Sequence, residues 1–185
     1  MKNLLSYFFI LSLLSFTLIF ECKSQTNKQK SKNPYEDCTF DTTSYEPTTK
    51  AIQTYNKTIS YSWNQETKTA KCILPDGDIL FLHIGGCDHY SYSAELHTAI
   101  SYSQTEKLIE KTRWVAMNFF SDGFDKQYDQ LISSGKYKIE EPQKKDFQYY
   151  DLIEGDHEPT NHILDGFSFL KNGKGTIIRV SAYIN

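Results

Sequence analysis

The stretch that decides the fold is residues 63–97, WNQETKTAKCILPDGDILFLHIGGCDHYSYSAELH. Residues 69–74 and 78–84 are β-favouring runs on either side of an Asp76-Gly77 pair. Such a pair is a strong hairpin signal, because Gly supplies the positive φ of a tight turn without strain. Gly85-Gly86 allows a second reversal before the next run begins. The stretch therefore predicts three consecutive antiparallel strands.

The runs that flank this hairpin alternate with the period of two that is typical of a half-buried strand. From residue 90, the side chains on one face are Tyr90, Tyr92, Ala94 and Leu96, and those on the other are Ser91, Ser93, Glu95 and His97. Before the hairpin, Ile59, Tyr61 and Trp63 alternate with Thr58, Ser60 and Ser62. We therefore expect a four-stranded meander.

Helical periodicity follows the meander. Ser103 and Glu106 form a capping box, which predicts a helix start. A buried stripe then follows helical spacing: Leu108, Ile109, Thr112, Val115, Ala116, Phe119 and Phe120. Asp122-Gly123 separates this helix from a second one, which Gly135 is placed to end.

The last third returns to strands, at 137–139, 147–153, 163–170 and 175–184, with Asn172-Gly173 as a hairpin turn. The predicted fold class is α+β. Its antiparallel β-sheet comprises the four-stranded N-terminal meander and the C-terminal hairpin, and two helices pack on one face.

The N-terminus predicts export. Residues 1–22 combine a basic start with an apolar run, which describes a signal peptide of the lipoprotein type, with Cys22 at the acylated position. Glu21 departs from the small residue expected before that cysteine, so a soluble exported protein and an uncleaved membrane anchor remain as alternatives. Residues 23–36 read as a flexible linker and 37–185 as a single domain. Each alternative places the domain outside the cytoplasm, in the periplasm, at the cell surface or secreted.

Composition narrows the class of partner. The net charge is −3 and no basic cluster lies beyond the linker, which argues against nucleic acid. Aromatic residues make up 15% of the chain, which favours a β-rich exported fold and can equip a binding face.

Cysteines in an exported chain usually pair. If Cys22 is acylated, three remain. A two-residue turn at Asp76-Gly77 would place Cys72 opposite Phe81, too far from Cys87 for a disulfide. Cys38 precedes the first regular strand and could reach either of them. Of the two pairings that remain, we predict a Cys38–Cys87 disulfide, with Cys72 as a buried free thiol.

A group of short motifs resembles small uncharacterised exported proteins and lipoproteins of Gram-negative bacteria. The motifs are Cys38-Thr39-Phe40, Trp63-Asn64 and Gly86-Cys87-Asp88-His89-Tyr90, within residues 37–97. The resemblance implies an envelope location and a disulfide-pinned β domain, and it carries no activity.

Two sets of residues raise the hypothesis of catalysis. His83, Cys87 and His89 have zinc-ligand side chains but match no standard zinc spacing, and Cys87 with His89 could also form a nucleophile and base. Carboxylates and histidines crowd the segment 151–165: Asp151, Glu154, Asp156, His157, Glu158, His162 and Asp165. Side chains of these types can bind Ca²⁺ or cleave a glycosidic bond, but a solvated loop explains them more simply.

Trp114 and Met117 lie three residues apart on the first predicted helix, away from the buried stripe. An exposed Trp-Met pair would suggest a surface for a partner, whereas a covering loop or C-terminal segment would make it part of the core.

These features favour a non-catalytic binding module without a cofactor, which binds another protein of the envelope or periplasm and is held at the membrane by its lipid anchor. An inhibitor or immunity protein against a toxin or hydrolase is the natural role. The alternatives are a metal- or carboxylate-dependent hydrolase of cell-wall or glycan material, and an accessory structural lipoprotein.

Overall fold

The computed structural model describes residues 38–40, 43–140, 144–153 and 161–185. Several predictions lie outside these residues: the signal peptide, Cys22, the linker and residues 154–158 of the acidic segment. None of the described helices is long and apolar enough to cross a membrane.

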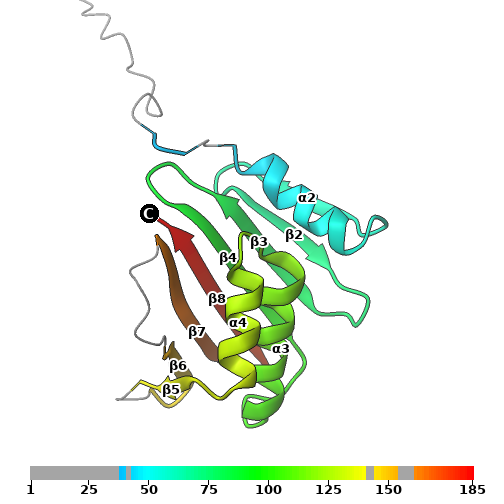
Figure 1. Ribbon diagram of the computed structural model, residues 1–185. Helices are drawn as coiled ribbons and strands as arrows, with labels where there is room; N and C mark the ends of the chain where they lie inside the picture. The colour runs from blue at the N-terminus through cyan, green and yellow to red at the C-terminus, as the bar shows by residue number, and fades with distance from the viewer. Residues whose placement is uncertain (1–37, 41–42, 141–143, 154–160) are drawn as a thin grey trace, which may run out of the picture. The chain divides into compact units, whose positions relative to one another are not determined.

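The described residues form one eight-stranded antiparallel sheet and three helices, which confirms the α+β class (Figure 1). The helices are α2 (Tyr45–Tyr55), α3 (Thr105–Phe119) and α4 (Phe124–Ser133). The strands are β1 (Tyr61–Asn64), β2 (Thr69–Ile73), β3 (Ile79–Gly85), β4 (Tyr90–Thr98), β5 (Tyr137–Ile139), β6 (Phe147–Leu152), β7 (His162–Asn172) and β8 (Gly175–Ile184).

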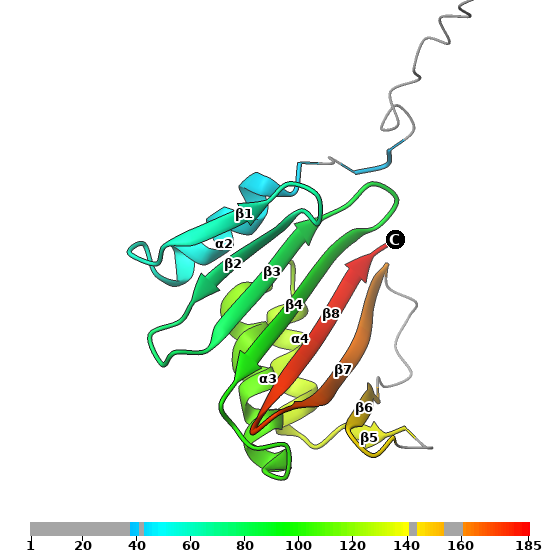
Figure 2. The same ribbon diagram turned by 180° about the vertical axis from the view of Figure 1, so that it is seen from behind.

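The strand order is β1-β2-β3-β4-β8-β7-β6-β5. The predicted meander is therefore one half of the sheet, and β5–β7 form the other half. The last strand, β8, lies between β4 and β7 and joins the two halves (Figure 2).

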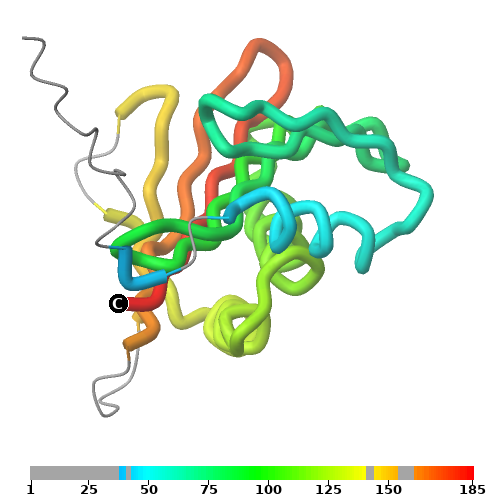
Figure 3. The backbone as a smooth tube through the Cα atoms, turned by 90° about the horizontal axis from the view of Figure 1, so that it is seen from above, coloured from blue at the N-terminus to red at the C-terminus, as the bar shows by residue number. Residues whose placement is uncertain are grey.

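All three helices cover the same face of the sheet, as Figure 3 shows from the end of the molecule. Alternate strand residues point into this layer and are almost fully buried, among them Leu80, Leu82, Leu96, Phe169 and Ile178. The opposite face carries the other half of each alternation, and no described helix lies on it (Figure 2).

Helix α2 was not predicted. It packs on β2 and β3, where Ile52 is fully buried. The Thr48 hydroxyl donates to the Ile84 carbonyl at 3.2 Å and accepts from the Ile84 amide at 2.9 Å. These tertiary contacts compensate for a segment rich in β-branched Thr, whose intrinsic helix propensity is low.

The capping box predicted for the start of α3 does not form. The helix begins at Thr105 with Gln104 as N-cap, and no side chain caps it. The Ser103 hydroxyl instead lies 3.1 Å from that of Ser101. Gly135 does end α4, with φ +69° and its amide bonded to the Ile132 carbonyl.

The Asp76-Gly77 hairpin is one residue longer than predicted. Leu74 and Asp78 close a three-residue loop in which Gly77 has φ +88°. This register pairs Cys72 with Leu80 instead of Phe81 and places the thiol on the helix-covered face. Cys72 is free and buried, and burial raises its pKa to about 11.

Candidate functional site

A row of side chains crosses the uncovered face of the sheet. Lys71, Phe81, Glu95 and Arg179 are successive cross-strand neighbours on β2, β3, β4 and β8. We call these four residues the charged row. The register alone places them side by side, because directly opposite residues of antiparallel strands project on the same face about 5 Å apart.

The charged row is held together by defined contacts. The Glu95 carboxylate accepts a hydrogen bond from Arg179 Nε at 2.7 Å, and its other oxygen lies 2.7 Å from His97 Nε2. The Phe81 ring lies 5.2 Å from the His97 ring and 5.5 Å from the Lys71 ammonium. Partial burial raises the pKa of Glu95, but the hydrogen bonds from His97 and Arg179 lower it by more. The pKa of Glu95 is therefore below its usual value.

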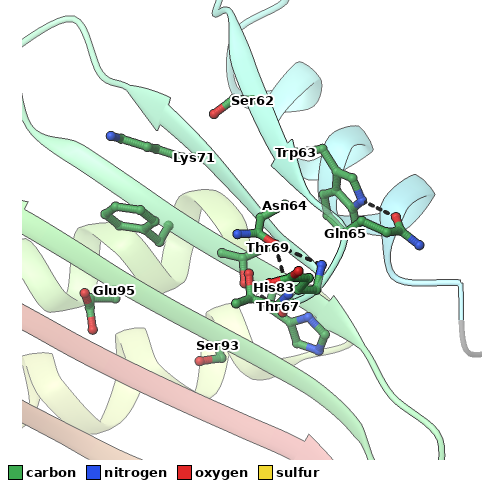
Figure 4. Close-up of a pocket in the computed structure, with 12 residues that line it drawn as sticks. Ser62, Trp63, Asn64, Gln65, Thr67, Thr69, Lys71, His83, Ser93 and Glu95 are labelled. Atoms are coloured by element: carbon green, nitrogen blue, oxygen red, sulfur yellow. Dashed lines mark hydrogen bonds between the residues drawn. The ribbon is translucent and has the colours of Figure 1, made fainter.

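Beside the charged row, the sheet face is hollowed towards the β1–β2 turn. This sheet-face hollow of about 780 Å³ is shown in Figure 4. Its hydroxyl and amide groups come from β1, β2, β4 and the turn: Ser62, Asn64, Gln65, Thr67, Thr69 and Ser93. Lys71, Phe81, His83 and Glu95 form the rest of its surface, with Trp63 and Glu66. Donors, acceptors and both signs of charge are therefore available within one concave area.

The turn that borders this hollow is rigidly held. The Asn64 side-chain oxygen accepts bonds from two backbone amides of the turn, at 2.9 and 3.1 Å. Lys68 has φ +53°, and its carbonyl lies 2.7 Å from His83 Nδ1. Since a carbonyl only accepts, Nδ1 is the donor, and His83 fastens the turn to β3. These bonds fix the shape of this edge of the hollow.

The side chains of zinc-ligand type, His83, Cys87 and His89, have other roles. Cys87 is bonded to Cys38, with Cα atoms 4.7 Å apart, which confirms the predicted disulfide in the structure. His83 fastens the β1–β2 turn, and the ring of His89 lies 5.4 Å from that of Tyr183. Within the described residues, no three His, Cys, Asp or Glu side chains are placed to hold a metal ion.

Trp114 and Met117 differ in their surroundings. Trp114 is half-buried against Tyr55 of α2, with ring centroids 5.6 Å apart, and the Lys111 ammonium lies 4.4 Å from its ring. Met117 is 48% exposed. Helix α2, which was not predicted, therefore covers part of Trp114, while Met117 remains exposed. The two side chains do not form one exposed pair, so the charged row is the stronger candidate for a binding surface.

The described part of the acidic segment is divided between different partners. Asp151 lies 3.3 Å from the ammonium of Lys138 on β5. Asp165 accepts a hydrogen bond from the Ser181 hydroxyl at 2.8 Å. The ring of His162 lies 4.8 Å from that of Phe124.

Sequence reasoning did not select the charged row. The alternation of β4 placed Glu95 and His97 on one face, but Lys71 and Arg179 join them only through strand pairing. Comparisons with family models, with curated proteins and with solved structures found no match to this chain.

Proposed function

We propose that this chain is a non-catalytic protein-binding module and that the uncovered sheet face is its binding surface. The observation that carries the proposal is the charged row. An uncovered sheet face needs only scattered polar side chains for solubility. Here the carboxylate, guanidinium and aromatic ring of the row are held in one network with the neighbouring His97 imidazole, beside a hollow.

Such a surface suits a macromolecular partner. Arg and aromatic side chains are enriched among the residues that anchor protein interfaces. The bond from Arg179 to Glu95 and the contact between Phe81 and His97 already restrain these side chains, so less conformational entropy is lost on binding. The alternating charges, Lys71, Glu95 and Arg179, would favour a partner of complementary pattern.

We further propose that the protein is exported and acts in the envelope, anchored through Cys22, as an inhibitor or immunity protein. The disulfide between Cys38 and Cys87 supports export, because disulfides persist in oxidising compartments.

The experiment compares proteins captured from the native envelope by the wild type, by a Lys71→Glu/Arg179→Glu variant and by a Lys126→Glu control. Lys126 is exposed on α4, on the helix side of the sheet. We expect one protein to be retained by the wild type and the control and lost by the double variant. That protein is then purified and its binding is measured directly. The double variant should bind it with a Kd at least about tenfold higher than the wild type, which is a loss of about 1.4 kcal/mol of binding free energy.

Equal capture by all three baits would contradict the assignment of the surface. Turnover of a cell-wall or glycan substrate that is abolished by Glu95→Gln would replace the proposal with the hydrolase alternative. Capture of several envelope-assembly proteins through the same face would indicate the accessory structural role.

A further inference from the structure

A second hollow lies on the opposite, helix-covered side of the sheet, between α2, the adjoining ends of β3 and β4, and the α3–α4 turn. Its volume is about 350 Å³, within the range of small-molecule sites. We call it the helix-side hollow.

The floor of this hollow is apolar. Ile84, Tyr92, Phe119 and Phe120 line it, and each is at most 6% exposed. The rings of Tyr92 and Phe120 lie 5.5 Å apart. This floor is continuous with the protein core, and so it is fixed in shape.

The rim is polar and carries opposite charges. Lys50 and Thr54 come from α2, and Asn118, Ser121 and Asp122 come from the end of α3 and the turn after it. Lys50 and Asp122 are both exposed, and neither has an ion-pair partner among the described residues.

Asp122 has an unusual backbone. Its φ is +55°, and Lys68 is the only other described residue besides glycine with a positive φ. A left-handed backbone costs most residues with a Cβ about 1 kcal/mol, but Asp and Asn adopt it more readily than the others. Both residues lie in tight turns: Lys68 in the β1–β2 turn, and Asp122 in the α3–α4 turn, where the Phe124 amide bonds the Ser121 carbonyl at 3.0 Å. At Asp122 the turn also places a carboxylate at the edge of the hollow.

The Asp122 carboxylate is oriented by the floor beneath it. Tyr92 donates its hydroxyl hydrogen bond to Asp122 Oδ2, and Ser121 Oγ lies 2.7 Å from the Tyr92 oxygen. Burial and this hydrogen bond raise the pKa of Tyr92, which keeps the phenol protonated as the donor. Asp122 Oδ1 accepts no hydrogen bond from any residue that the structure describes.

We propose that the helix-side hollow binds a small zwitterion with an apolar side chain, of the α-amino-acid class. Asp122 Oδ1 receives the ammonium group, Lys50 pairs with the carboxylate, and the apolar side chain lies on the floor of Tyr92, Phe119 and Phe120. A ligand with only one charge would leave one rim charge without a partner, and a ligand without an apolar group would leave the floor unfilled. This site is separate from the binding surface proposed above.

The test is calorimetric titration of the protein with L-leucine, L-methionine and L-phenylalanine. Two probes each lack one charge of leucine: 3-methylbutylamine lacks the carboxylate, and 4-methylpentanoate lacks the ammonium. We expect at least one of the amino acids to bind. Where leucine binds, it should bind at least about tenfold more tightly than either single-charge probe.

Two variants assign the charges. Asp122→Asn should weaken amino-acid binding at least about tenfold, and Lys50→Gln should do the same. Asn tolerates a positive φ, so the first variant keeps the turn. Glu110→Gln and Lys57→Gln remove exposed charges elsewhere and should leave binding unchanged. Unchanged melting temperatures show that each variant is folded.

The proposal is overturned if none of the three amino acids binds at millimolar concentration. It is also overturned if a single-charge probe binds as tightly as leucine, or if both rim variants bind like the wild type. Protein capture by the uncovered sheet face is a separate measurement, so either proposal can fail without the other.

Discussion

Replacing Lys111 tests how the meander is fastened to the helix layer. Lys111 lies on α3, and its ammonium lies 2.6 Å from Asp76 in the β2–β3 turn and 2.9 Å from Asp78, which closes that turn. We expect Lys111→Met to destabilise the protein by about 3 kcal/mol, because breaking a buried pair leaves the other charge without compensation.

The magnitude follows from the burial of the partners. The side chains of Lys111 and Asp78 are 15% and 9% exposed, so this pair is nearly shielded from water. Asp76 is 51% exposed, and its bond adds little. Only one of the two bonds therefore has a large effect, which places the estimate at the lower end for a buried pair.

The same bonds predict the pH dependence. Burial lowers the pKa of Lys111, but its bonds to Asp76 and Asp78 raise it more, to above its ordinary 10.5. Its contribution is therefore complete below pH 10.5 and lost as the pH rises through the folded value. Burial raises the pKa of Asp76, but Lys111 holds it below its ordinary 3.8, so that contribution is lost only in acid.

Urea unfolding and thermal melts provide the measurement. A loss of about 3 kcal/mol should lower the Tm by about 10 °C in a domain of this size. The control is Lys107→Met, one turn earlier on α3 and exposed, which should change stability by less than about 0.5 kcal/mol. Adding Asp78→Asn to Lys111→Met should restore part of the loss. If Lys111→Met and the control Lys107→Met lose the same stability, the bond between Lys111 and Asp78 does not fasten the meander.

Three further outcomes are expected. Tyr128→Phe should cost about 1–2 kcal/mol in urea unfolding, because its buried hydroxyl bonds carbonyls of β7 and β8, whereas Tyr183→Phe should cost almost nothing. Replacing Cys38 and Cys87 together by Ser should cost about 4 kcal/mol, since their bond closes a loop with a sequence separation of 49, and an unchanged melt would refute this. In Glu95→Gln, the drop in Tm between about pH 6 and pH 3 should be smaller than in the wild type. The ionised Glu95, whose pKa is lowered in the fold, stabilises the wild type near neutral pH, and this contribution is lost as the pH falls through the lowered pKa.

The sequence predicted the elements that local chemistry determines. Asp76-Gly77 and Asn172-Gly173 marked real hairpins, and the Leu108–Phe119 stripe marked the buried side of α3. Helix α2 was missed because its helical state depends on tertiary bonds from Thr48 to β3, which no local pattern encodes. Gly77 indicated that a turn would form but not how long it would be. The loop is one residue longer than predicted, and this shift changed the cross-strand partner of Cys72.

The candidate site was less predictable than the fold. Glu95 and Arg179 are adjacent on the sheet but separated by 84 residues in the chain. Their pairing requires both the order of the strands and the register between β4 and β8, and neither follows from alternation alone. The sequence marks Asp122-Gly123 as a helix break and a possible cap of the next helix, whereas the positive φ of Asp122 and its bond to Tyr92 are properties of the folded chain.

The central position of β8 also governs when the sheet can be completed. Strand β4 pairs Tyr90 with Ile184 and Thr98 with Thr176, so the middle of the sheet depends on the segment that is synthesised after all the other strands. Until that segment leaves the ribosome, β4 and β7 each lack a neighbour, and the two half-sheets cannot merge. Pairings this distant in the chain also form slowly. The order of the strands thus delays completion of the sheet until translation has passed β8.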